Sequence, residues 1–205
     1  MNYINTTTGE YPVTEATIRA ASPNTSFPAP FVAPQGYAQV FPAPQPAYNP
    51  VTHGVREIAP ALTDKGHYEQ RWEVFALDQQ QADANTAAAR AAKWEAIKAL
   101  RDQKVQTGGY QVGSKWYHSD TFSRTQQIGL VMMGANIPAG LQWKTMDGTF
   151  VTMTQQLAAQ VFAAAAAQDA ALFAHAENLR AQVNAAADPA GVDIAAGWPA
   201  TYGGT

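Results

Sequence analysis

The 205-residue chain contains no cysteine, which excludes disulfide frameworks and thiolate metal sites. Charged residues are also scarce, at 14% of the chain against roughly 25% in a typical soluble protein. We therefore expect partner proteins to cover much of the surface. The 13 lysines and arginines are scattered and the net charge is only -3, which argues against nucleic-acid binding.

A signal peptide and a membrane-spanning run are also missing from the sequence. No basic N-terminal region precedes an apolar stretch, and no apolar run approaches the ~20 residues needed to cross a bilayer. The alanine-rich stretch from Leu157 to Leu179 is interrupted by polar residues, namely Gln160, Gln168, Asp169, His175 and Glu177. We expect synthesis and assembly in the cytoplasm, without membrane insertion.

Nucleotide-binding motifs are absent as well. The glycines of GGYQVGSKWYHSD, from Gly108 to Asp120, have the spacing of a phosphate-binding loop. Ser114 precedes Lys115, however, which reverses the lysine-then-hydroxyl order of that motif. The stretch follows a predicted helix and leads into a predicted strand, so it favours a tight β-hairpin, with Gly108 ending the helix.

The adjoining residues His118, Ser119 and Asp120 have the side-chain types of a hydrolytic triad. Neighbours on a strand point to opposite faces and cannot form such a relay, so we interpret Ser119 and Asp120 as helix-start residues and His118 as a partly buried aromatic. The four histidines show no metal-ligand spacing, and HExxH and EF-hand patterns are absent. The sequence predicts no enzyme and no catalytic, cofactor-binding or metal-binding residues.

Overall, the pattern predicts an α+β protein that begins with an extended, proline-rich arm over residues 1–54. The motif FPAP occurs twice, at Phe27 and at Phe41, and its prolines disfavour helix and central strand. Spaced aromatics on a stiff backbone suit docking on a neighbouring protein, with a plain linker as the alternative. The arm's predicted contact residues are Phe27, Phe31, Tyr37, Phe41 and Tyr48. Within the arm, a short helix is expected after an N-cap at Thr14, with Ser22 and Pro23 ending it.

Residues 55–77 are predicted to form a β-hairpin unit whose turn contains Asp64 and Gly66. Its expected buried face includes Tyr68, Trp72 and Val74, with an irregularity at Gln70. A lone two-stranded hairpin is only marginally stable. We therefore expect this hairpin to pack on the following helix or on another subunit.

Residues 78–187 are predicted to form a helix-hairpin-helix-hairpin-helix domain. The first helix begins at an Asp78 cap, the second begins at Asp120 or Ser123, and the second hairpin turns at Asp147 and Gly148. The last helix is capped either by Thr152 with Gln155 or by Thr154 alone. The core face expected for the second helix consists of Phe122, Ile128, Leu130, Val131 and Met132. The packed stripe expected for the last helix runs through Leu157, Val161, Ala165, Gln168, Leu172, Ala176, Leu179 and Val183.

The remaining residues, 188–205, are predicted to form an extended C-terminal tail. Pro189 ends the helical pattern, and the tail carries two aromatic residues, Trp198 and Tyr202. We predict that both contact a partner protein.

Three motifs in the helical part carry a family resemblance: GGYQVGSKWYHSD, the SRTQ that follows it, and LQWKTMDGTFVTM. Together they make Arg101 to Thr154 resemble a domain of unknown function that is common in tail-region proteins of tailed bacteriophages and prophages. The resemblance extends over about residues 80–185. The stretch YEQRWEVFAL before the first helix is similar to a small domain of tail-fibre and tail-fibre-assembly proteins. The family that Arg101 to Thr154 resembles has no established activity, so the resemblance assigns no site residues.

The resemblance implies a virion protein of the phage tail, made and assembled in the host cytoplasm. Together with the scarce charge and the aromatic arm, it predicts a structural or adaptor component of the tail tip or baseplate. Its expected partners are tail-fibre, baseplate or tail-tip subunits and further copies of itself, with trimeric symmetry suggested by the family setting. Two alternatives remain open, a tail-fibre assembly chaperone and a cell-wall hydrolase of the tail tip.

Overall fold

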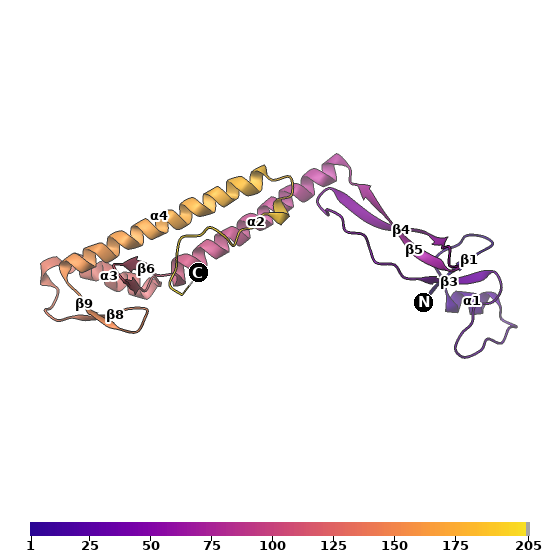
Figure 1. Ribbon diagram of the computed structural model, residues 1–205, viewed down its shortest axis with the longest axis horizontal. Helices are drawn as coiled ribbons and strands as arrows, with labels where there is room; N and C mark the ends of the chain where they lie inside the picture. The colour runs from indigo at the N-terminus through magenta and orange to yellow at the C-terminus, as the bar shows by residue number, and fades with distance from the viewer. Residues whose placement is uncertain (204–205) are drawn as a thin grey trace. The chain divides into compact units, whose positions relative to one another are not determined.

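A computed structural model of the protein describes residues 1–203, so Gly204 and Thr205 of the predicted tail lie outside the described residues. The chain forms two compact units, unit 1 from Met1 to Asn85 and unit 2 from Thr86 to Thr205. Unit 1 is built around a sheet, and unit 2 combines long helices with two short hairpins (Figure 1). The predicted α+β class is confirmed.

Unit 1 contains a five-stranded sheet with the strand order β2-β1-β3-β5-β4. Strand β3 pairs with β5 in parallel, whereas the other pairings are antiparallel. The strands are β1 (Asn2–Asn5), β2 (Val13–Thr14), β3 (Tyr37–Phe41), β4 (His53–Leu62) and β5 (Tyr68–Ala76).

The segment predicted as an extended arm therefore belongs to a folded unit. It supplies three strands and the helix α1 (Glu15–Ala21), whose Thr14 cap and Ser22 end confirm the predicted short helix. The prediction of an extended, proline-rich arm outside that helix is wrong for Tyr37–Phe41, because the YAQVF stretch of β3 contains no proline and is free to pair with β1 and β5.

The predicted hairpin of residues 55–77 is confirmed as β4 and β5. The predicted irregularity at Gln70 is confirmed: the register shifts between Ile58 and Ala61 on β4, where two residues stand opposite the single residue Gln70 of β5. Pro60, which has no N–H for the ladder, stands at that irregularity. The hairpin pairs with β3 of its own chain, where Val40 lies opposite Tyr68. The N-terminal segment thus provides packing that we had expected from the next helix or another subunit.

Unit 2 follows the predicted order of helices and hairpins. The first of these helices starts within unit 1, where Asp78 accepts from the Gln81 N–H at 2.8 Å. In unit 2, Asp120 accepts from the Ser123 N–H and Thr154 accepts from the Leu157 N–H. These contacts decide between the alternative caps in favour of Asp120 and Thr154. The elements are α2 (Gln79–Thr107), β6 (Tyr110–Val112), β7 (Lys115–Tyr117), α3 (Thr121–Met133), the 3₁₀ turn η1 (Gly134–Asn136), β8 (Gln142–Lys144), β9 (Phe150–Thr152), α4 (Gln155–Ala185) and the 3₁₀ turn η2 (Pro189–Gly191).

Two apolar clusters hold unit 2 together along α4. At its beginning, Val161 packs with Tyr110, Tyr117 and Leu130 of the first hairpin and α3. Further along, Leu179 and Val183 pack with Ile97 of α2. Figure 1 shows α3 and both hairpins beside the first half of α4. The predicted stripe of α4 is confirmed at its buried positions, Val161, Leu172, Ala176, Leu179 and Val183.

The C-terminal segment after α4 is docked on unit 2 and includes η2. Val192, Ile194 and Trp198 pack on the cluster formed by α2 and α4. Gln168 donates to the Ala200 carbonyl at 2.8 Å, and the Tyr202 N–H donates to the Gly108 carbonyl at 2.8 Å. The segment therefore packs against the core of unit 2.

Candidate functional site

Helix α3 turns a different face to the core from the one that its apolar residues predict. Leu130 is buried and Val131 is partly buried, as expected. Phe122, Ile128 and Met132 were predicted to be buried, but they are 72%, 47% and 83% exposed. Three of the five predicted core positions on α3 are thus wrong.

Polar contacts explain this orientation of α3. Gln127 is buried because the Tyr110 hydroxyl donates to its Oε1 and its Nε2 donates to the His118 carbonyl at 3.1 Å. Burial raises the pKa of Tyr110 to about 12. On the same side of the helix, Arg124 pairs with Asp169 of α4 and donates to the Ser119 carbonyl at 2.6 Å. With Gln127 and Arg124 held inward, Phe122 and Met132 must face outward.

An open apolar groove of about 800 Å³ lies between α3 and the second hairpin. Helix α3 forms one wall with Phe122, Gln126, Leu130 and Met133, and the other wall consists of Leu141, Trp143, Lys144 and Phe150. Phe150 is 62% exposed, so an aromatic ring with little cover stands on each wall. A surface that concentrates exposed rings in a hollow is typical of a binding site.

Polar side chains also line the groove, namely His118, Ser123, Gln126, Gln142 and Lys144. Lys144 is exposed and forms no ion pair within residues 1–203, and no carboxylate lines the groove. The indole N–H of Trp143 is buried and has no acceptor among the described residues. The lining therefore offers apolar contact, several polar side chains and the unpaired positive charge of Lys144.

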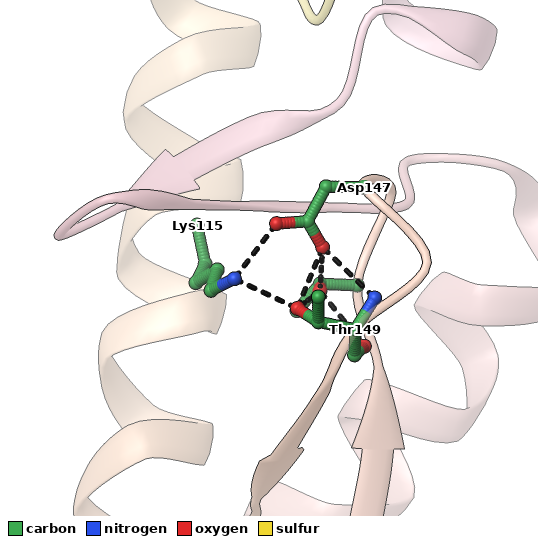
Figure 2. A network of polar contacts seen from close by, with 4 residues as sticks. Lys115, Asp147 and Thr149 are labelled. Carbon is green, nitrogen blue, oxygen red and sulfur yellow. Dashed lines mark hydrogen bonds and ion pairs between the residues drawn. The ribbon is translucent and has the colours of Figure 1, made fainter.

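A polar network fixes the turn of the second hairpin (Figure 2). Lys115 of β7 donates to Asp147 Oδ2 and to Thr149 Oγ1, both at 2.7 Å. Asp147 Oδ1 also accepts from the Thr149 N–H at 3.0 Å and from the Thr145 hydroxyl at 2.6 Å. The lysine, with help from both threonine hydroxyls, lowers the pKa of Asp147. These contacts attach the β8–β9 turn, and hence the Phe150 wall, to the first hairpin.

Of the two predicted helix-start residues in WYHSD, Asp120 begins α3, whereas Ser119 contacts the backbone just after the end of α2 instead. Ser119 is buried and its Oγ accepts from the Gly109 N–H at 2.9 Å, while Asp120 caps α3. The hydroxyl of Ser123 lowers the pKa of Asp120. Over residues 1–203, no three His, Asp or Glu side chains lie close enough together to hold a metal ion.

The predicted partner-binding aromatics do not form one surface. In unit 1, Phe27, Phe31 and Tyr37 pack against the buried cluster of Tyr3, Val13 and Ile18, whereas Phe41 is 44% and Tyr48 is 39% exposed. In unit 2, Trp198 packs on His175 with ring centroids 4.7 Å apart and donates its N–H to the Ile194 carbonyl. Tyr202 stays 40% exposed beside Trp116.

Sequence reasoning missed the groove residues Phe122, Met133, Lys144 and Phe150. Phe122 had been assigned to the core by its apolar character. The signal that could have corrected this assignment is the polar pair Arg124 and Gln127, which are three residues apart and share one face of α3 with Leu130 and Val131.

Contrary to the expectation that no stretch could cross a bilayer, helix α4 meets the length and composition criteria for a membrane-spanning helix. About a fifth of its most apolar window is buried. One such helix is weak support for a membrane span, because core helices of soluble proteins meet the same criteria. In this structure α4 carries the Asp169 ion pair and the buried stripe of unit 2.

Comparison with known proteins places the second half of the chain in a family. A family model described as a domain of unknown function, DUF4376, matches residues 88–196. These residues include α3, both hairpins and the whole lining of the groove. No curated protein and no solved structure matches the chain. Because the match covers more than half of the residues of this chain, the chain belongs to the DUF4376 family.

Proposed function

We propose that this chain is a structural or adaptor component of a tailed-phage tail tip or baseplate, where it connects or supports tail fibres through protein–protein contacts. The phage setting rests on the sequence resemblance of the segment Arg101 to Thr154. Its expected partners are tail-fibre, baseplate or tail-tip subunits, with self-association, as a trimer for example, in the assembled tail. The scarcity of charge supports a surface that other subunits cover.

The observation that carries the adaptor role is the groove between α3 and the second hairpin. Its exposed Phe122 and Phe150 would lose contact with water on binding, and each fully buried aromatic side chain contributes about 1.5–3 kcal/mol. The polar contacts of Arg124, Gln127 and Asp147 hold the two walls in place without a ligand. A preformed apolar site binds at a lower ordering cost than a flexible one.

Quantitative mass spectrometry of purified virions tests this proposal. We expect the chain to be present in a fixed small-integer ratio to the tail fibre, and that ratio gives the symmetry of its assembly. Absence from virions combined with abundance in the infected-cell lysate would favour the assembly-chaperone alternative. Incorporation of Phe150→Ser, compared with the matched control Phe162→Ser on α4, then shows whether the groove contributes. Equal incorporation of the two variants would mean that another surface holds the chain in the tail.

A further inference from the structure

We propose that the groove between α3 and the β8–β9 hairpin receives an amphipathic α-helical segment of a partner protein, with a carboxylate placed beside its apolar stripe. This inference rests on the adaptor role and names the chemistry of the partner that the groove selects. Three features of the groove support it: its length, its apolar walls and its single unpaired charge.

The length of the groove fits a helical segment. Phe122, Gln126 and Met133 line the α3 wall, and the 11 residue steps from Phe122 to Met133 correspond to about 16 Å of helix. A partner helix lying along this wall can place three turns of apolar residues, spaced i, i+3 or i+4, and i+7, against it. Phe150 and Trp143 on the opposite wall provide aromatic contact for the same stripe. An elongated open groove of this kind suits a peptide better than a compact metabolite.

The positive charge of Lys144 determines which charged group should lie beside the apolar stripe of the partner helix. Lys144 is exposed, lines the groove and has no ion pair within the described residues, whereas the nearby Lys115 is neutralised by Asp147. A carboxylate on the partner would therefore meet a free cation and no competing anion in the lining. Like charges that meet across an interface are unfavourable, so a basic segment is disfavoured there.

The same charge argues against two other occupants. A two-fold dimer built on this groove would bring two copies of Lys144 to one interface, where they would repel each other. A nucleic acid would need several cations for its phosphates, but Lys144 is the one lysine or arginine that lines the groove. The partner helix is therefore expected from another protein.

Selection from a display library of random 16-residue peptides on the immobilised full chain tests the inference. We expect the selected peptides to share large apolar residues at helical spacing and an acidic residue beside them. One selected peptide, labelled with a fluorophore, should bind Phe122→Ser and Phe150→Ser at least about tenfold more weakly than the wild-type chain. Phe162→Ser, which removes a ring of 48% exposure from α4 outside the groove, should leave the affinity within about twofold.

A charge reversal at Lys144 tests the carboxylate. Selection on Lys144→Glu should replace the acidic residue with a basic one, while selection on Lys65→Glu, in the exposed β4–β5 turn, should return the original acidic pattern. If the peptides selected on Lys144→Glu still carried an acidic residue, the proposed pairing of Lys144 with a partner carboxylate would be overturned. Affinities that are unaffected by both Phe122→Ser and Phe150→Ser would overturn the groove as the binding site. Circular dichroism of each variant verifies that the helices remain folded.

Light scattering of the free chain shows whether the groove binds a second copy of this chain or, as proposed, a helix from another protein. A dimer that dissociates in Phe150→Ser but not in Phe162→Ser would assign the groove to self-association and overturn the partner-helix proposal. Failure of the peptide tests would leave the virion measurement unaffected. Conversely, absence from virions would remove the tail role and leave the peptide specificity of the groove standing.

Discussion

Arg124 of α3 and Asp169 of α4 form a two-point ion pair, with Nη1 2.5 Å from Oδ2 and Nη2 2.8 Å from Oδ1. Their side chains are 26% and 29% exposed. The guanidinium group also donates to the backbone carbonyls of Ser119 and Val105. One side chain thus connects the end of α2, the start of α3 and the middle of α4, and it determines which face of α3 is left for the groove.

Replacing Asp169 with Asn should lower the free energy of unfolding by about 1–3 kcal/mol, because a partly buried guanidinium would lose its charged partner. Urea unfolding of the full chain, followed by far-ultraviolet circular dichroism, measures the change. Glu95→Gln is the matched control, since Glu95 pairs with Lys98 on the surface of α2 and is 72% exposed. Glu95→Gln should lower the free energy of unfolding by less than about 1 kcal/mol. An equal loss of unfolding free energy in both variants would contradict the conclusion that the Arg124–Asp169 pair stabilises the protein more than a surface ion pair does.

Acid should weaken the β8–β9 turn. The folded-state pKa of Asp147 lies below its ordinary value because Lys115, Thr145 and Thr149 stabilise the carboxylate. Its contribution to stability is therefore fully present above the unfolded-state pKa of about 3.9 and is lost as the pH falls through the lower folded-state value. The difference in melting temperature between wild type and Asp147→Asn should narrow below about pH 4.

Thermal melts between pH 7 and pH 2 measure this narrowing. Asp102→Asn, which removes an exposed carboxylate from α2 in the same unit, controls for the general effect of one lost charge. A difference between wild type and Asp147→Asn that stays constant over the whole pH range would rule out the turn network as its source.

Alkali should destabilise unit 2 through Tyr110. Burial raises its pKa from 10.0 to about 12 in the folded state. The folded state thus holds the phenolic proton more tightly than the unfolded state, and the resulting stability is present below about pH 10 and is lost as the pH rises to about 12. In Tyr110→Phe, stability should decline less steeply between about pH 10 and pH 12. At neutral pH the same variant should have a free energy of unfolding lower by about 1 kcal/mol, because the hydrogen bond to Gln127 is lost.

Melting temperatures from pH 8 to pH 12 for wild type and Tyr110→Phe measure both effects. Tyr48→Phe, at a 39% exposed position in unit 1, is the control. If the decline with pH were as steep in Tyr110→Phe as in wild type, the buried hydroxyl would not be its cause.

Unit 1 should depend on Phe27 for its stability. Phe27 packs beside Phe31 on the cluster of Tyr3, Val13 and Ile18, and the Arg19 guanidinium lies 5.1 Å from its ring. Phe27→Ser should therefore destabilise unit 1 by about 2 kcal/mol, somewhat less than the loss of a fully buried phenylalanine. Hydrogen exchange read by mass spectrometry should show faster exchange in β1 and β3, with α3 and α4 unchanged.

Phe41→Ser is the matched control, because this ring is 44% exposed and contacts His67 edge-on. We expect it to change the exchange of β1 little. Equal exchange in the two variants would support the original interpretation of both rings as contacts for a partner.

Local signals in the sequence determined much of this protein. A helix begins where a side chain satisfies the backbone N–H groups of the next turn, and Asp78, Asp120, Thr14 and Thr154 all do so within three residues. The turn at Asp147 is equally local, since its carboxylate binds the N–H of Thr149 two residues on. These contacts need no distant partner, so the helices and hairpins of unit 2 could be predicted in their observed order.

Only the tertiary structure decided which side chains the elements bury. Strand β3 exists because β1 and β5 supply its ladders from distant parts of the chain, and those contacts convert a predicted arm into a sheet. Gln127 faces inward because the Tyr110 hydroxyl donates a hydrogen bond to it. Arg124 faces inward because the carboxylate of Asp169, 45 residues away, accepts its hydrogen bonds and pairs with its charge. Buried polar groups are stable only with such partners. The apolar character of Phe122 and Met132 could therefore predict neither their exposure nor the groove that Phe122 helps to form.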